Sequence, residues 1–91
     1  MIYIKPIAPY VPPKQRDICH VAQDIRAQWT KPYFAAVPYL KAMSYLRTKD
    51  DKHGVETARE IIIYFLANAS TFRGEHARRL KQELKDICGI K

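Results

Sequence analysis

Apolar residues recur at intervals of three and four along most of this 91-residue chain, and this spacing constrains the fold more than any other feature. It is the spacing of one face of an α-helix, because half-buried strands alternate apolar and polar residues instead. Residues 14–29, 32–46, 55–69 and 74–88 each show it. A chain of this length can form one small domain around a single apolar core. We therefore expect an all-α fold, a compact four-helix domain over residues 14–91.

The third of these segments has the widest apolar face, so we expect it to be the central helix. The fourth segment ends at Gly89, and glycine is a common helix stop because it tolerates the left-handed backbone conformation. The residues expected to face the core in the first, third and fourth segments are Ile18, Val21, Ala22, Ile25 and Trp29; Ala58, Ile61, Ile62, Phe65, Leu66 and Ala69; and Ala77, Leu80, Leu84 and Ile87.

Pro38 interrupts the second segment, and its effect can be interpreted in two ways. A continuous helix from Pro32 would be kinked there, because proline removes one backbone hydrogen bond. Alternatively, Pro38 starts a new helix after one loose turn. The apolar residues keep one helical phase across Pro38, which favours the kinked helix. These residues are Ala35, Ala36, Tyr39, Leu40, Ala42, Met43 and Leu46.

The first 13 residues, MIYIKPIAPYVPP, are rich in proline and alternate only loosely. Such a segment predicts an extended arm, with one short strand at residues 2–4. An isolated strand needs a partner, so the arm is expected to lie over the helices or to pair with a second copy. Ile63 falls on the polar side of its helix and is expected to be covered by the arm or by a partner. We therefore expect a homo-oligomer whose interface contains Ile2, Tyr3, Ile4, Tyr10 and Ile63.

The chain carries a formal net charge of +7, and this charge is unevenly distributed. Residues 1–49 hold eight lysines and arginines against two acids, residues 50–70 hold two against four, and residues 71–91 hold six against three. An excess of this size favours acidic partners, either nucleic acid or an acidic protein. A basic surface that only keeps the protein soluble is the other interpretation of the same charge.

A ridge of basic residues is predicted on the last helical segment, where Arg78, Lys81 and Lys85 fall on one flank of the apolar stripe. No acidic residue of this helix lies among them, and Arg73, just upstream, extends the ridge. The mutual repulsion of neighbouring cations costs little free energy in water, and each cation can neutralise a phosphate group. The ridge is therefore the predicted nucleic-acid-binding site.

The opposite flank of the same segment gathers Glu75, Glu83 and Asp86 around Arg79. The spacing predicts ion pairs of Arg79 with Glu75 and Glu83, each worth about 0.2–0.5 kcal/mol, so Arg79 is expected to be structural. The first turn offers Glu75 and His76, whereas proteins that read bases place arginine, asparagine or glutamine there. The sequence thus favours contacts with the phosphate backbone over base recognition.

Aromatic rings are interleaved with the basic residues, as in proteins that stack the bases of single strands. Trp29 and Tyr39 lie on apolar stripes, so we expect them in the core. Tyr33, Tyr45 and Tyr64 fall off the stripes and are candidates for exposed contacts. Tyrosine is also common in protein interfaces, so these rings fit either kind of partner.

No arrangement of residues points to catalysis, to a metal ion or to another cofactor. The three histidines are far apart in sequence, and none of the usual metal-ligand spacings occurs. Cys19 is next to His20 but is expected on a different face of the helix, so the two form no thiol–imidazole pair. Residues 49–60 have the glycine and glutamate of a calcium loop, but Lys49 occupies its first position, where a carboxylate is needed. We therefore expect a protein that is not an enzyme.

The chain is expected to be cytoplasmic. Its two cysteines, Cys19 and Cys88, are too few for a disulfide framework and are expected to be partly buried, reduced thiols. Lys5 interrupts the apolar run at the start, so no signal peptide is predicted. The longest apolar run, residues 61–67, is too short to span a bilayer, and we expect no membrane partner.

Three stretches resemble known proteins: the proline-rich start, WTKPYFAAVPYLKAM (29–43) and HGVETAREIIIYFLANASTFRGEHARRLKQELK (53–85). Over about residues 29–85 the chain resembles small proteins without an assigned activity that are encoded on bacterial mobile elements, namely phages and plasmids. The resemblance implies a bacterial, cytoplasmic accessory protein, and it carries over no functional residues.

The sequence therefore predicts a small, basic, helical binding module. The first hypothesis is nucleic-acid binding through Arg73, Arg78, Lys81 and Lys85. The alternative is a protein-interaction or structural adaptor of a phage or plasmid. Such an adaptor would self-associate or bind a host protein through its N-terminal arm and its exposed apolar residues.

Overall fold

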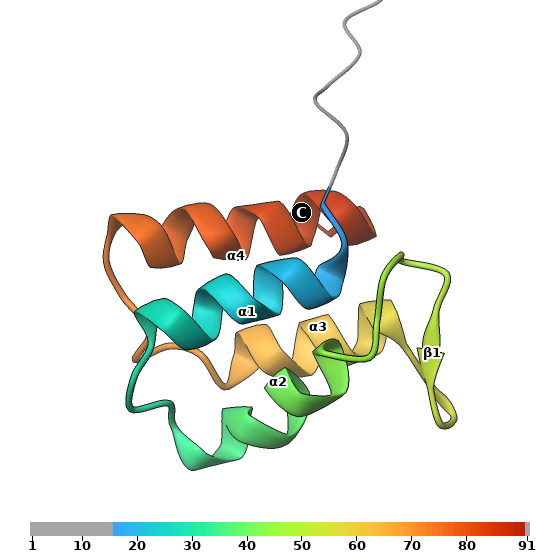
Figure 1. Ribbon diagram of the computed structural model, residues 1–91, viewed down its shortest axis with the longest axis horizontal. Helices are drawn as coiled ribbons and strands as arrows, with labels where there is room; N and C mark the ends of the chain where they lie inside the picture. The colour runs from blue at the N-terminus through green and yellow to red at the C-terminus, as the bar shows by residue number, and fades with distance from the viewer. Residues whose placement is uncertain (1–15, 91) are drawn as a thin grey trace, which may run out of the picture.

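Four α-helices contain most of the residues that the computed structural model describes, 16–90 (Figure 1). The prediction of a mostly helical fold with four helices is confirmed, with the addition of a small two-stranded sheet. The predicted arm, with Ile2, Tyr3, Ile4 and Tyr10, lies outside the described residues. In chain order the elements are α1 (Ile18–Gln28), the 3₁₀ turn η1 (Phe34–Ala36), α2 (Val37–Met43), β1 (Lys52–His53), β2 (Glu56–Thr57), α3 (Ala58–Ala67) and α4 (Glu75–Cys88).

The four helices enclose one apolar core. α1 packs against α4 and α2, and α3 packs against α2 and α4. Figure 1 shows α4, α1 and α2 from top to bottom, with α3 running between α1 and α2. The core residues predicted on the first, third and fourth segments are all buried except Leu66, which is half-buried. Helical spacing alone therefore identified the inward faces of these helices.

Trp29, at the C-terminal end of α1, connects three parts of the core. Its ring stacks on Phe72 with the ring centroids 5.1 Å apart, and it meets Phe65 edge-on at 6.3 Å. Phe65 belongs to α3, and Phe72 lies between α3 and α4. The prediction that Trp29 belongs to the core is confirmed, because it is only 8% exposed. Tyr39 is half-buried, and its ring centroid lies 5.7 Å from that of Tyr64.

The second helix begins later than predicted, and the kinked continuous helix is wrong. Tyr33 has φ −57° and ψ 132°, which is not helical, and η1 follows it. α2 then starts at Val37 and places Pro38 in its first turn. The missing N–H of proline breaks no hydrogen bond there, because the first turn of a helix has no internal partners for these groups. The other alternative, a new helix at Pro38 after one loose turn, is therefore correct.

α1 begins at Ile18, and another part of the chain satisfies its first backbone groups. The Ile18 N–H donates to the Arg47 carbonyl at 3.0 Å, and the Cys19 N–H donates to the Leu46 carbonyl at 2.8 Å. These bonds take the place of a side-chain cap, since Asp17 at the N-cap position makes no capping hydrogen bond. The start of α1 is therefore fixed to the segment that follows α2.

A β-hairpin occupies part of the predicted loop, residues 47–54, and part of the predicted third helix. β1 and β2 pair antiparallel, with Lys52 opposite Thr57. Gly54 has a φ of 65° in the turn between them, a backbone conformation that glycine adopts without strain. α3 consequently begins at Ala58, later than the helical spacing predicts.

Thr57 and Glu60 form a capping box that fixes the start of α3. The Glu60 N–H donates to Thr57 Oγ1 at 3.2 Å, and the Thr57 N–H donates to Glu60 Oε1 at 3.2 Å. Each residue thus satisfies a backbone N–H that the helix leaves without a partner. The bond from the Thr57 backbone stabilises the charged carboxylate and lowers the pKa of Glu60.

Candidate nucleic-acid interface

The predicted basic residues lie together on one side of α4 and just before it, and we call Arg73, Arg78, Lys81 and Lys85 the basic flank. The 14 residues of α4 make it about 21 Å long. Arg78 and Lys85 lie two turns apart, and no carboxylate of the described residues is within ion-pair distance of either. Arg73 precedes the helix, and its Nε donates to the Ser70 carbonyl at 3.1 Å.

Lys81 differs from the exposed cation that the spacing predicts, because its ammonium group has partners inside the chain. Its Nζ donates to the carbonyls of Ala69 and Phe72, both at 2.7 Å, and lies 5.7 Å from the centroid of the Phe72 ring. Burial lowers the pKa of Lys81, and the positive charges of Lys85 and Arg73 lower it further. The two carbonyl oxygens act in the opposite direction, since they stabilise the ammonium form. Lys81 therefore fixes the segment between α3 and α4 to the side of α4 through these two hydrogen bonds.

Replacing Lys81 with methionine should lower the free energy of unfolding by about 1–3 kcal/mol, because two carbonyls lose a charged donor while the alkyl stem keeps its packing. Urea titration followed by circular dichroism measures this change. Lys85→Met removes the same charge from the same flank and should change the free energy of unfolding by less than about 0.5 kcal/mol. Equal urea midpoints for the two variants would contradict a structural role of Lys81.

Two further cations, Arg59 of α3 and Lys49, lie near the C-terminal end of α4. Burial raises the pKa of the Cys88 thiol in the last turn of α4, and the positive charges of Arg59 and Lys49 oppose this rise. Both side chains are exposed, and no ion pair is formed by either within residues 16–90. Lys49 lines a hollow at this end of α4 together with the carboxylates of Asp50 and Asp86. Helical spacing does not reveal these two cations, because their proximity to α4 depends on the packing of the helices.

Glu83, on the opposite flank of α4, is bound by Arg16, which lies just before α1. Arg16 binds Glu83 through two hydrogen bonds, Nε to Oε2 and Nη2 to Oε1, both 2.7 Å long. Its Nη1 donates to Asp24 at 2.6 Å. Glu83 first and Asp24 second raise the pKa of Arg16, whose positive charge they stabilise. The predicted ion pairs of Arg79 with Glu83 and Glu75 are wrong.

Arg79 instead lies near a histidine of its own helix, with Nη2 3.4 Å from His76 Nδ1.

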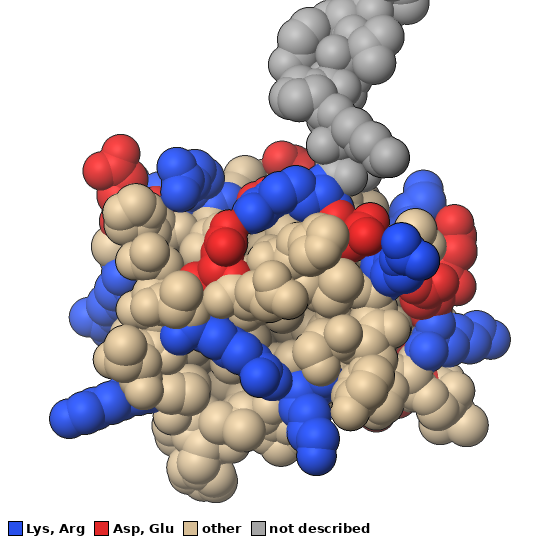
Figure 2. Space-filling model, viewed as in Figure 1, with Lys and Arg blue, Asp and Glu red and all other residues tan. Residues whose placement is uncertain are grey.

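Figure 2 shows the face with α1 and α4 in its upper part, where acidic and basic side chains are intermixed. Basic side chains predominate in its lower part, around α2. The exposed basic residues in and before that helix include Lys31 and Lys41. Positive charge is therefore offset along the contact between α1 and α4 but not everywhere else.

A shallow hollow of about 350 Å³ lies at the N-terminal end of α4. Its lining includes Arg73, Arg78 and Lys81 from the basic flank, together with Gly74. Gly74 has a φ of 110° and provides no side-chain cap, so the first N–H groups of α4 are not capped from that position. The positive end of a helix adds to the field of the neighbouring cations, and Glu75 in the first turn opposes it.

Three tyrosines predicted as exposed contacts are confirmed as exposed: Tyr33, Tyr45 and Tyr64. Phe34, which the sequence analysis did not select, is 77% exposed, and its ring centroid lies 4.8 Å from that of Tyr33. Its place in η1, before the amphipathic part of α2, removes it from the core-facing stripe. Ile63 is 37% exposed, and its cover by the arm or by a partner stays a prediction.

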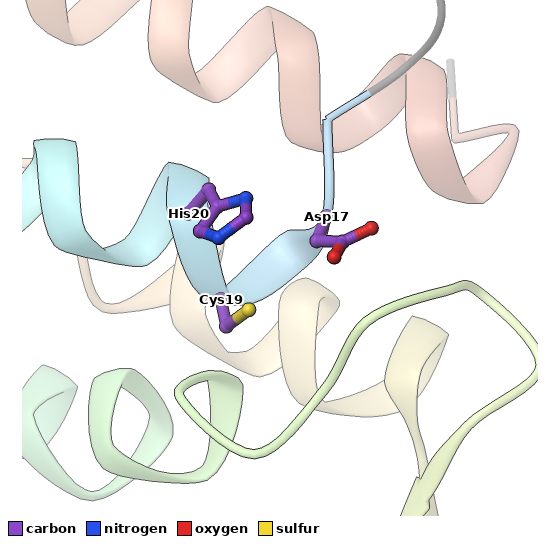
Figure 3. Close-up of side chains that lie close together, drawn as sticks. All are labelled: Asp17, Cys19 and His20. Carbon is purple, nitrogen blue, oxygen red and sulfur yellow. The ribbon is translucent and has the colours of Figure 1, made fainter.

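The start of α1 brings Asp17, Cys19 and His20 together (Figure 3), with their ligand atoms within 4.8 Å of one another. The ligand atoms of Cys19 and His20 therefore lie closer together than the expected difference in helical face implies. Successive helical residues diverge by about 100°, but side chains of the first turn also lean toward the N-terminus, where they meet. Cys19 is half-buried and Cys88 is buried, and both are free thiols.

Comparison with known protein families, with curated proteins and with solved structures finds no match for this chain. The origin in a bacterial mobile element thus stays a prediction. No helix within residues 16–90 is both long and apolar enough to cross a membrane.

Proposed function

We propose that this domain is a binding module without catalytic activity, and that it holds the phosphate backbone of a nucleic acid on the basic flank of α4. The observation that carries this proposal is the absence of ion pairs at Arg78 and Lys85 among the described residues. Arg16 engages Glu83 on one side of the helix, while Arg78 and Lys85 on the other side have no carboxylate partner among the described residues.

The spacing of Arg78, which is exposed, and Lys85, which is half-buried, suits a phosphate backbone. Arg78 and Lys85 are seven residues apart, which is about 10.5 Å along a helix. Phosphates of one strand of a DNA duplex follow one another about every 3.4 Å along its axis, so two cations at this separation can contact two different phosphates. Arg73 and the hollow beside it add a third contact at the N-terminal end. Lys81 has a positioning role, because its ammonium group holds the connection that presents Arg73.

Contacts of this kind do not distinguish one sequence from another. Arginine and lysine bind phosphate oxygens, which are the same at every nucleotide. The first turn of α4 presents Glu75 and His76, which are both exposed and offer no arginine, asparagine or glutamine to a base edge. We therefore propose binding that depends on charge and not on base sequence. Single-stranded and double-stranded nucleic acid are both expected ligands, because both present the same phosphate groups.

Fluorescence anisotropy with a labelled duplex of arbitrary sequence tests this function. Binding should be clear at about 50 mM salt and weaker at about 200 mM salt, with log K falling by about 0.9 for each phosphate contact per unit of log salt concentration. Three contacts predict a slope of about −2.7 for a duplex and a similar affinity for an unrelated sequence. The absence of binding at about 50 mM salt would remove the proposal.

The alternative is a protein-interaction adaptor, and the exposed aromatic residues favour it. Tyr33, Phe34 and Tyr64 are 45%, 77% and 44% exposed, which is high for large apolar side chains. The predicted homo-oligomer would use the arm and Ile63. Light scattering on the full chain measures the mass in solution, and a strict monomer would contradict self-association.

A further inference from the structure

The first turn of α1 gathers three side chains of the types that bind transition metals (Figure 3). A carboxylate oxygen of Asp17, Sγ of Cys19 and a ring nitrogen of His20 all lie within 4.8 Å of one another. No other group of three such ligands lies this close together within residues 16–90. We propose that these side chains form a binding site for one divalent transition-metal ion, Zn²⁺ in the first place, with a fourth position available to water.

The three ligand atoms suit zinc in type and approach it in geometry. Zinc binds carboxylate oxygen, imidazole nitrogen and thiolate sulfur with bonds of about 2.0–2.3 Å, usually in a tetrahedral arrangement. Tetrahedral bonds of that length place the ligand atoms about 3.3–3.8 Å apart, so the widest separation has to close by about 1 Å. Rotation of the side chains can supply this movement, because His20 is exposed and Cys19 is only half-buried.

The backbone beneath the three side chains is fixed, so metal binding has only side chains to order. The N–H groups of His20 and Val21 both donate to the Asp17 carbonyl, at 3.0 and 3.2 Å. The Cys19 N–H is held by the Leu46 carbonyl at 2.8 Å, and Val21 is fully buried. A site built on such a rigid turn loses little conformational freedom when its ligands converge.

Asp17 is available as a ligand because other groups cap the helix. An aspartate at the N-cap position usually accepts a hydrogen bond from the first turn. Here the carbonyls of Leu46 and Arg47 accept from the start of α1, and the Asp17 carboxylate makes no capping bond. Its carboxylate instead accepts from Arg47 Nε at 3.4 Å, and the Arg47 side chain is 76% exposed. Exposed ion pairs of this length are weak, so a divalent ion can displace the guanidinium group.

The local charges favour a cation on balance. Cys19 as thiolate and Asp17 as carboxylate contribute two negative charges. The positive end of α1 is equivalent to about half a charge, and the Arg47 guanidinium adds one more. Arg16 is already bound to two carboxylates elsewhere, at 2.6 and 2.7 Å. The ion releases the thiol proton on binding, and only then do the two negative charges slightly exceed the positive ones around the ion.

The mixture of ligands also selects the kind of metal. Calcium and magnesium prefer oxygen ligands only, whereas a set of nitrogen, sulfur and oxygen suits zinc and its spectroscopic substitute cobalt. All three ligands come from one turn, so the ion would not cross-link different parts of the fold. The fourth position, open to water or to another donor, is the feature that distinguishes catalytic zinc sites from closed structural ones.

Titration of the reduced full chain with Co²⁺ tests this site, followed by the absorption band that a cobalt–thiolate bond produces. We expect the band to saturate at one Co²⁺ per chain and to disappear when Zn²⁺ is added. Cys19→Ser should remove the band. His20→Ala should weaken Zn²⁺ binding at least about tenfold, because even the loss of a residue that only supports a metal ligand costs 10- to 100-fold.

Cys88→Ser is the matched control, because it makes the same atomic change at the other thiol, which is buried in α4. This variant should keep the band. Because His20 is exposed, His20→Ala tests the site even where a cysteine variant folds poorly by circular dichroism. Absence of the band in the unchanged protein, its survival in Cys19→Ser or unaltered Zn²⁺ affinity in His20→Ala would overturn the proposal. A ratio of one ion to two chains would overturn it as a site of a single chain.

Discussion

Replacement of Trp29 by alanine is expected to lower the free energy of unfolding by about 3–5 kcal/mol, as measured by urea titration followed by circular dichroism. The ring is 8% exposed and lies against two other buried rings, those of Phe65 and Phe72. Alanine leaves a cavity where α1, α3 and the segment before α4 meet. Small domains have only about 0.05–0.15 kcal/mol of stability per residue, so this loss is a large part of the total. The urea midpoint should fall by about 2 M or more.

Phe34→Ala provides the matched control, because it also removes an aromatic ring. Phe34 is 77% exposed, and its loss should change the free energy of unfolding by less than about 0.5 kcal/mol. Trp29→Phe keeps an aromatic ring in the cluster and should fall between the two variants. Similar urea midpoints for Trp29→Ala and Phe34→Ala would show that the three rings do not form a cooperative part of the core.

The inward faces of the helices could be predicted because burial on a helix repeats with its turn. Trp29 and Phe65 fall on apolar stripes, and both are buried. Periodicity could not decide the effect of Pro38, since a kinked helix and a new helix keep the same phase across it. The difference lies in where the missing N–H falls, and the structure places it in the first turn of α2, where it breaks no helical hydrogen bond.

The ends of the helices depend on hydrogen bonds that periodicity does not contain. α1 starts at Ile18 because carbonyls from residues 46 and 47 accept from its first N–H groups, and such a contact depends on the tertiary fold. The start of α3 had a local signal, the Thr57-x-x-Glu60 pattern of a capping box. This pattern would have moved the start of the helix past residue 55 and left room for the β-hairpin.

The sequence predicted which basic residues share one flank of α4, but it did not predict the partners of Glu83 and Lys81. Helical spacing placed Arg78 and Lys85 on one flank, and the structure leaves both without a carboxylate partner among the described residues. The partners of Glu83 and Lys81 could not be predicted from their own helix. Arg16, 67 residues away from Glu83, binds it through two parallel hydrogen bonds, an arrangement stronger than a single exposed pair within α4. The carbonyls that hold Lys81 are 9 and 12 residues away.

Changing Arg78 and Lys85 together to glutamate should weaken nucleic-acid binding at least about tenfold at about 50 mM salt, with little effect on helicity. Each phosphate contact contributes about 0.9 to the slope of log K against log salt concentration, so the slope should become shallower by about 1.8. Two contacts of this kind account for about a twelvefold change in affinity between 50 and 200 mM salt. Fluorescence anisotropy measures the affinity and the slope, and circular dichroism measures the helicity.

The double variant Arg26→Glu with Lys41→Glu is the matched control. It distinguishes the effect of where positive charge is removed from the effect of how much is removed. Both residues are exposed, lie on α1 and α2 and form no ion pair within residues 16–90. The net charge changes by the same amount in both double variants, so a protein that binds only through its overall charge would lose affinity equally in the two. Binding on the basic flank predicts a large loss for the α4 variant and a small one for this control. A larger loss of affinity in this control than in the α4 variant would contradict binding on the basic flank and would indicate a site on the face formed by α1 and α2. The reason is that direct contacts with phosphates, and not the field of distant charges, set the slope of affinity against salt concentration.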